Sequence, residues 1–380
     1  MSTVSLIRCP DYHPLRVEGA AREAIDLLGG IQRFVRPGDR VLLKINLLDG
    51  AAPEKAITTH PAVVRALIHL VREAGGVPRV GDCAGIEGPP SLSRFRGACR
   101  RAGILAVCEE EGVELAHLSG ASTEVENPAG RAFKRFTLAR GVVEADVVIS
   151  LPKLKTHGLM LYTGGVKNLF GCIPGLLKAQ MHVRAQRPES FAQMLVDLLV
   201  AVRPALTVMD AVTAMEGNGP RNGRPRDVGA ILGSTDPVAL DAIACQIVGI
   251  PPEVVLTTRL AEEQGVGTGE LARIEVRGES PGSIRVEGFR LPAGQSGLFQ
   301  ALGRVGFLKD RLVARPQAVA DRCKGCWTCV EHCPVGALSK NGSIPAFDYR
   351  KCISCYCCQE LCPHDAIVLR RPLVARWLMP

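Results

Sequence analysis

The chain has 380 residues, of which 47% are hydrophobic, so it can bury a large core and is long enough for two domains. Its formal charge of +8 is spread along the sequence, which favours anionic small molecules or partners and argues against a nucleic-acid-binding protein. No apolar run is long enough to cross a membrane, and Arg8 and Asp11 come too early for a signal peptide, so we expect a cytoplasmic protein.

Strand-like and helix-like segments alternate from the N-terminus onwards. We expect strands at 4–9, 40–46, 77–82, 113–118, 145–151, 205–210 and 228–234, and helices at 17–30, from 61, through 91–111, at 189–202 and from 237. This alternation predicts an α/β fold, an open and mostly parallel sheet with helices on both faces.

The composition shifts to Gly, Pro and Arg between about residues 265 and 320. This region contains short strand-like pieces at 273–278 and 283–289, and residues 296–313 could form an amphipathic helix. We therefore expect a large domain over 1–290, a linker over 291–316 and a small α+β domain over 317–380.

Two runs in the C-terminal region, "CKGCWTCVEHCP" and "CISCYCCQELCP", share the spacing C-x2-C-x2-C-x3-C-P. This is the signature of bacterial two-cluster ferredoxins, in which the fourth cysteine of each run binds the other cluster. The predicted ligands are Cys323, Cys326, Cys329 and Cys362 for one 4Fe-4S cluster, and Cys352, Cys355, Cys358 and Cys333 for the second. Zinc is the alternative, and the duplicated runs with their prolines disfavour it. The spare Cys357 reads as a small residue packed beside a cluster.

Ionisable and polar residues follow most of the predicted strands of the large domain. Ligands of open parallel sheets bind at the carboxyl ends of the strands, so a shared cleft there is the economical explanation. The candidates for this cleft are Lys44, Asn46, His60, Asp82, Lys153, Lys155, His157, Lys167, Asn168, Asp210 and Glu216.

Several of these residues also have a structural interpretation. Asp236 and His60 each precede a proline at an expected helix start, where they can act as N-caps. Turns select Asn and Asp, so Asn46, Asp82 and Asp210 fit either interpretation. An unpaired Lys44 inside an apolar strand would be costly, which indicates a carboxylate partner or a ligand.

The stretch "SLPKLKTHGLMLYTGGVKNLFG" carries the strongest signal for a site. A solvated basic loop is the alternative, yet the segment starts directly at a buried strand. We expect Lys153, Lys155 and Lys167 to hold carboxylate, phosphate or phenolate groups, and His157 to transfer protons near neutral pH. A desolvated lysine among other cations would have a lowered pKa and could itself donate a proton.

The large domain resembles the family called domain of unknown function 362. The segments "LLKINLL", "TTHPAVVRALI", "DAVTAMEGNGP" and "DPVALDAIA" carry the resemblance together with the lysine-rich stretch, over roughly residues 30–250. Fusion to a two-cluster ferredoxin module is familiar in that family. The resemblance implies an iron–sulfur protein whose large domain acts on an unidentified molecule.

Together these features favour a reductase that passes electrons through two 4Fe-4S clusters to a small anionic conjugated, carbonyl or aromatic substrate. No glycine fingerprint indicates bound nicotinamide or flavin nucleotide, so the electrons would come from ferredoxin or another low-potential donor. A further metal or an unrecognised flavin at Cys83, Cys172 or His182 stays open. The alternatives are an electron-transfer or assembly partner, and a non-redox transferase or ligase with structural clusters.

Overall fold

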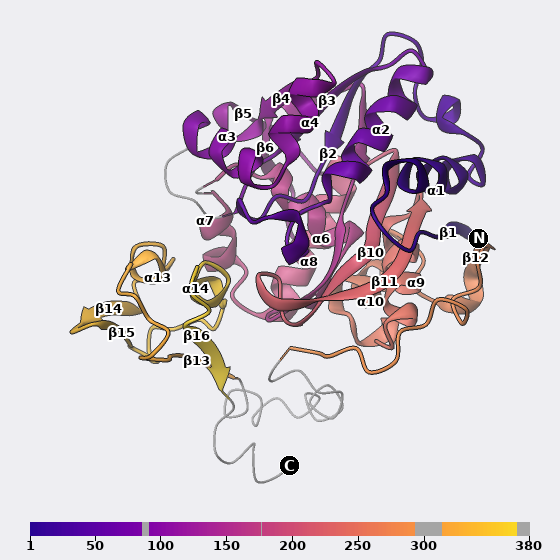
Figure 1. Ribbon diagram of the computed structural model, residues 1–380. Helices are drawn as coiled ribbons and strands as arrows, with labels where there is room; N and C mark the ends of the chain where they lie inside the picture. The colour runs from indigo at the N-terminus through magenta and orange to yellow at the C-terminus, as the bar shows by residue number, and fades with distance from the viewer. Residues whose placement is uncertain (86–90, 176, 293–313, 371–380) are drawn as a thin grey trace.

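The computed structural model describes residues 1–85, 91–175, 177–292 and 314–370 (Figure 1). A ten-stranded sheet forms the centre of the large domain, with the strand order β12-β1-β11-β10-β7-β2-β3-β4 and with β8 and β9 branching from β10. Its strands are β1 (Ser2–Arg8), β2 (Arg40–Lys44), β3 (Val77–Asp82), β4 (Glu114–His117), β7 (Val147–Ser150), β8 (Lys153–His157), β9 (Leu161–Thr163), β10 (Leu206–Asn218), β11 (Asn222–Ser234) and β12 (Ile274–Gly278).

Helices cover both faces of this sheet (Figure 1). They are α1 (Pro14–Asp26), α2 (Pro61–Glu73), α3 (Leu92–Arg101), α4 (Ile104–Glu110), α5 (Arg140–Val143), α6 (Gly165–Asn168), α7 (Leu177–Arg184), α8 (Pro188–Val202), α9 (Pro237–Ile247) and α10 (Leu256–Glu263). One hydrophobic cluster joins α1, α2 and α4 to the sheet, and two others involve α8 and α9. In the described residues, no helix combines the length and the apolar character needed to cross a membrane.

Most strand pairs of the large sheet are parallel, which confirms the predicted fold class. The pairs β2–β3, β2–β7, β3–β4, β7–β10, β8–β10 and β1–β12 are parallel, whereas β1–β11, β10–β11 and β8–β9 are antiparallel. Asp236 is the N-cap of α9, because its Oδ1 accepts hydrogen bonds from the backbone N–H of Val238 and Ala239 at 2.9 and 3.2 Å.

The long strand β10 explains how the lysine-rich stretch is placed. Its first residues pair with the end of β7, through Leu206 with Ile149 and Thr207 with Ser150. Beyond that point β10 continues, and β8 takes the place beside it that β7 leaves. The lysines therefore lie in an added strand just past the carboxyl end of β7.

Some expectations about the elements are wrong. Residues 283–289 form turns rather than a strand, and the expected helix at 17–30 is α1, which starts at Pro14 and ends at Asp26. By contrast, the helical segments expected through 91–111 are present as α3 and α4, which are separated at Gly103 in a left-handed conformation. The hairpin of β5 (Ser122–Glu126) and β6 (Arg135–Ala139) had no counterpart in the predicted elements.

The C-terminal region folds as two small two-stranded sheets with two short helices. Strand β13 (Arg315–Ala318) pairs with β16 (Ile367–Arg370), and β14 (Leu338–Asn341) pairs with β15 (Ile344–Phe347). Helices α13 (Thr328–Glu331) and α14 (Cys357–Glu360) lie between them in sequence. The expected linker and its amphipathic helix lie largely outside the described residues.

Helix α14 packs against the large domain, whereas α13, β14 and β15 lie on the far side of the small domain (Figure 1). Gln359 makes two of the joining hydrogen bonds: its carbonyl accepts from Asn222 Nδ2 at 2.9 Å, and its Nε2 donates to the Asn218 carbonyl at 3.1 Å. A Cβ at Gly158 would lie 3.3 Å from Leu369, so the glycine permits a close approach of the two domains.

Candidate functional site

Strand β8 presents three cationic or titratable side chains in alternation, Lys153, Lys155 and His157. Side chains two residues apart in a strand share a face, so these three point from one side of β8. Each is only 1% exposed. The alternative of a solvated basic loop is therefore wrong, because β8 is a paired and buried strand.

Lys153 belongs to a buried ion pair at the start of β8. Its Nζ lies 2.9 Å from Asp210 Oδ2 and donates a hydrogen bond to the Tyr12 hydroxyl at 2.5 Å. The Tyr12 hydroxyl in turn donates to Asp210 Oδ1 at 2.8 Å, and its ring stacks on the His60 ring at a centroid distance of 3.6 Å. Burial lowers the pKa of Lys153, while the neighbouring carboxylate opposes this shift.

Lys155 is held by neutral groups instead. Its Nζ donates to Asn46 Oδ1 at 2.6 Å and to the Ile57 carbonyl at 2.7 Å. Burial, followed by the nearby charges of Lys167 and Lys153, lowers the pKa of Lys155 to about 7. This lysine can therefore exchange a proton near neutral pH.

His157 connects β8 to the C-terminal domain. Its Nδ1 accepts hydrogen bonds from the backbone N–H of Leu159 and Met160 at 3.1 and 3.3 Å, so the ring proton of the neutral imidazole lies on Nε2. That Nε2 lies 3.1 Å from Glu360 Oε1. Burial and the nearby Lys167 hold the pKa of His157 well below its ordinary value. Burial disfavours the charged ring, so the pKa of His157 is shifted away from neutral pH, and its part in proton transfer stays a prediction.

Lys44, at the end of β2, has a carboxylate partner in Asp82 at 2.9 Å and also donates to the Ile45 carbonyl at 2.7 Å. Asn168 lies beside this pair and donates from Nδ2 to the Lys44 carbonyl at 3.3 Å and to Ser150 Oγ at 3.0 Å. The Asp82 carboxylate thus balances the charge of the buried Lys44. An unpaired buried ammonium would cost considerable free energy, so a partner of this kind was expected.

Two further candidates have other surroundings. The carboxylate of Glu216 accepts from the backbone N–H of Arg290 at 3.0 Å and lies 3.8 Å from that guanidinium, so its contacts point to Arg290 and not to the lysines of β8. Lys167 is half-buried, and its Nζ lies 5.8 Å from the centroid of Phe170. Burial also lowers the pKa of Lys167.

Sequence reasoning missed four members of this region. Tyr12 and Glu360 come from distant parts of the chain, so only the fold brings them to β8. Lys178 donates to the Cys83 and Ala84 carbonyls. Asp241 accepts from the N–H of Gly165 and Val166 and so fixes the start of α6. For Asp241 the signal was available, since an Asp inside an apolar helical segment needs a partner.

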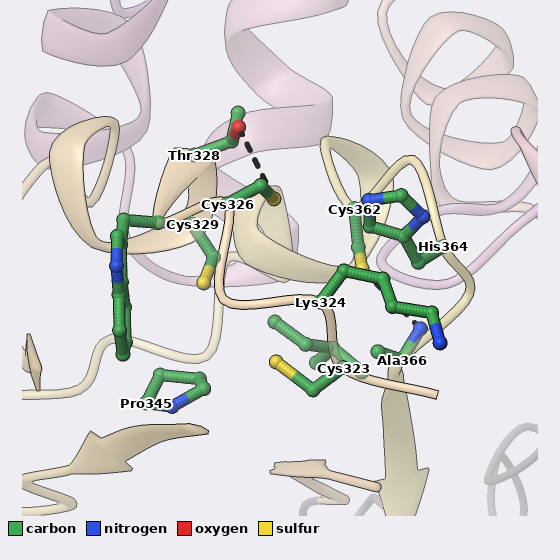
Figure 2. A pocket seen from close by; sticks show the side chains of 11 residues that line it. Cys323, Lys324, Cys326, Thr328, Cys329, Pro345, Cys362, His364 and Ala366 are labelled. Atoms are coloured by element: carbon green, nitrogen blue, oxygen red, sulfur yellow. Dashed lines mark hydrogen bonds between the residues drawn. The ribbon is translucent and has the colours of Figure 1, made fainter. Parts of the chain in front are cut away.

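The cysteines fit the first predicted cluster. Cys323, Cys326, Cys329 and Cys362 line one pocket, and their sulfur atoms surround a common space (Figure 2). Three of them come from the first run and the fourth from the second, as the exchange of fourth ligands requires. The fourth cysteine of each run accepts an equivalent backbone hydrogen bond. Ala337 N–H donates to Cys333 Sγ and Ala366 N–H donates to Cys362 Sγ, both at 3.2 Å.

The second set also converges. The nearby thiols of Cys355, Cys352, Cys329 and Cys333 add to burial in raising the pKa of Cys358. The two runs share a local conformation, since Trp327 and Tyr356 both take left-handed backbone angles immediately before α13 and α14. The residues thus fit a second cluster that faces α14, and the individual ligand assignment stays a prediction.

Comparisons with known proteins agree with the two-part organisation. The family model described as "Domain of unknown function (DUF362)" matches residues 41–246, and the model "4Fe-4S dicluster domain" matches residues 322–366. The thylakoid-associated protein sll1697 of Synechocystis sp. (strain ATCC 27184 / PCC 6803 / Kazusa) is 36% identical over 293 residues, which cover 77% of this chain and 88% of that protein.

A solved structure was also found, that of the lactate racemase apoprotein from Thermoanaerobacterium thermosaccharolyticum. It is 10% identical with a TM-score of 0.44, and the match covers 65% of this chain. The chain spans 56% of the length of that structure.

Proposed function

The chain belongs to the DUF362 family and carries an iron–sulfur domain, and we propose that it is a reductase of a small anionic substrate with a conjugated, carbonyl or aromatic acceptor group. The 3.1 Å contact between His157 and Glu360 carries this proposal. It joins the end of β8, the strand that carries Lys153 and Lys155, to α14, the helix that carries the predicted cluster ligand Cys358.

In the proposed holoprotein, the two clusters with the ligands predicted above supply single electrons. The large domain must then hold an acceptor, stabilise negative charge on it and deliver protons. Reduction of a conjugated double bond or a carbonyl takes up two electrons and two protons. Lys155 is suited to supply one of these protons, because its pKa is about 7, and the second proton must come from solvent, either directly or by reprotonation of Lys155.

The neighbouring residues set the state of Lys155. Lys153 keeps a carboxylate partner, so its charge is balanced before a substrate arrives. The hydrogen bonds of the Lys155 ammonium go to two neutral acceptors, Asn46 Oδ1 and the Ile57 carbonyl. An anionic substrate oxygen can replace these acceptors and form a stronger, charge-assisted hydrogen bond. We propose Lys155 as the proton donor, with Lys153 and Asn46 beside the substrate.

The pairing of Lys44 and Lys153 with buried carboxylates favours a second candidate, a large domain that docks a protein or holds a cofactor without chemistry of its own. In that case the lysines would be elements of a stable core. In the reductase, by contrast, replacement of Lys155 must reduce turnover.

The test uses anaerobically reconstituted full-length protein with dithionite as the reductant and a panel of anionic enoates and aryl keto acids as acceptors. We expect Lys155→Met to lower turnover at least about 100-fold, as for loss of a general acid, without changing the cluster absorbance. Lys134→Met, at an exposed lysine of the large domain, is the matched control. Unchanged turnover in Lys155→Met would refute the role of Lys155. Reducible clusters without consumption of any acceptor would support the docking function.

A further inference from the structure

The pocket of the first cysteine set is lined in part by residues of α13, and α13 lies on the side of the C-terminal domain away from the large domain (Figure 1). We call its rim the outer face, made of Lys324, Cys326, Trp327, Pro345 and His364. Lys324, Cys326 and His364 are exposed, and Trp327 is partly exposed. A protein that approaches from solvent can therefore reach this pocket.

The second set of cysteines is partly covered, because Cys358 is buried whereas Cys333, Cys352 and Cys355 are partly exposed. Helix α14, which carries Cys358, packs against the large domain, and Cys358 and Tyr356 are buried. The Tyr356 hydroxyl donates to the Ala314 carbonyl at 2.9 Å inside this interface. Of the eight predicted ligands, Cys326 at the outer face is the one that is exposed, so this face gives access from solvent to the first cysteine set.

The outer face carries two exposed lysines. Besides the cysteines, the ionisable residues that line the pocket are Lys324 and His364, and both are drawn in Figure 2. The second lysine is Lys340, whose Nζ lies 5.4 Å from the centroid of the Trp327 ring. The nearby Asp365 is offset by Arg322 at 3.2 Å. Among the residues that line this pocket, none is acidic.

An apolar centre inside a rim of like charge is typical of a protein-docking surface. The partly exposed Trp327 supplies flat apolar contact, while Lys324 and Lys340 supply exposed positive charge. The complementary partner carries negative charge around its own apolar centre. A small anion would not require Trp327 at the rim.

We propose that the outer face is the docking site of an acidic electron-carrier protein, which binds over Trp327 between Lys324 and Lys340. This inference rests on the proposed function in one respect: the reductase gives the docked protein its role, which is to supply electrons. Charge complementarity of this kind accelerates association and makes it dependent on ionic strength.

The test uses the full-length holoprotein and a plant-type 2Fe-2S ferredoxin of strongly negative net charge as the probe. Calorimetric titration of the two oxidised proteins at low salt gives the Kd without any turnover. The double charge reversal Lys324→Glu with Lys340→Glu should weaken binding at least about tenfold. The control reverses two exposed cations of the large domain, Arg131→Glu with Lys134→Glu, and changes the net charge equally.

A second readout separates docking from an effect on the clusters themselves. Reduction by photoreduced deazariboflavin, which is neutral, should proceed at the same rate in both double variants. Raising the ionic strength from about 20 to about 300 mM should weaken binding of the wild-type protein and abolish its difference from the reversed variant.

Three results would overturn the docking site. They are equal weakening in both double variants, unchanged binding in the outer-face variant, and binding that does not depend on salt. Because the Kd is measured without an acceptor, docking can fail while the Lys155 reductase test succeeds, and the reverse holds as well.

Discussion

Replacement of Lys155 by Met should change how the stability of the protein depends on pH. The folded pKa of about 7 lies below the ordinary lysine value of 10.5, so the unfolded chain binds more protons between these two values. The free energy of unfolding therefore rises with pH across this window. The displaced pKa corresponds to a penalty of ~5 kcal/mol when Lys155 is charged, which is fully present below pH 7 and has vanished above pH 10.5.

The effect is measurable within an accessible range. From about pH 6 to about pH 9, this residue should make wild-type stability rise by about 2–3 kcal/mol. Anaerobic urea unfolding, followed by far-UV circular dichroism, gives the difference between wild-type protein and Lys155→Met at each pH. The variant should be the more stable protein at pH 6, with an advantage that shrinks toward pH 9.

Lys155→Arg provides the contrast, because a guanidinium stays charged over the whole range. It should be less stable than Lys155→Met at every pH. A wild-type to Met difference that stays constant between pH 6 and pH 9 would show that Lys155 titrates as an ordinary lysine. The proposed proton donor would then lose its physical basis.

Two further predictions concern the C-terminal domain. Gly158→Val should loosen the packing of this domain on the large domain, since the added Cβ alone would lie 3.3 Å from Leu369. Hydrogen exchange of the α14 amides should therefore rise. The control is Gly282→Val, which should leave this exchange unaltered because the nearest atom to its Cβ is 4.0 Å away. Cys326→Ser should lower the iron content from about eight toward about four atoms per chain, whereas Cys357→Ser should retain about eight. Equal iron loss in both variants would make Cys357 a ligand.

The fold class could be predicted because its signals are local. Apolar runs separated by turn residues marked β2, β3, β7 and β11, and apolar spacing of three and four marked α8. The predicted strand at 283–289 has the same alternation as a true strand, yet it lacks a neighbour in the sheet. Strand pairing is decided by tertiary contacts, which a local pattern does not contain.

The candidate site was only partly predictable. Charge marked Lys153, Lys155 and His157, and their spacing of two also carried the signal for a strand with one cationic face. Their states depend on partners from elsewhere in the chain. Tyr12 lies 141 residues before Lys153, and Glu360 comes from the other domain. Burial then decides which group titrates near neutral pH, which composition does not reveal.

The three side chains of β8 differ in a way that follows their order along the strand. Lys153, nearest the centre of the sheet, is neutralised by Asp210, whereas Lys155 donates its hydrogen bonds to the neutral acceptors Asn46 Oδ1 and the Ile57 carbonyl. His157, at the far end, contacts Glu360 of the C-terminal domain. A strand that served packing alone would not require three buried titratable groups on one face, since each costs free energy unless it is compensated. Because only Lys155 is left without a carboxylate partner in these contacts, the middle of β8 is where an anionic ligand would gain most.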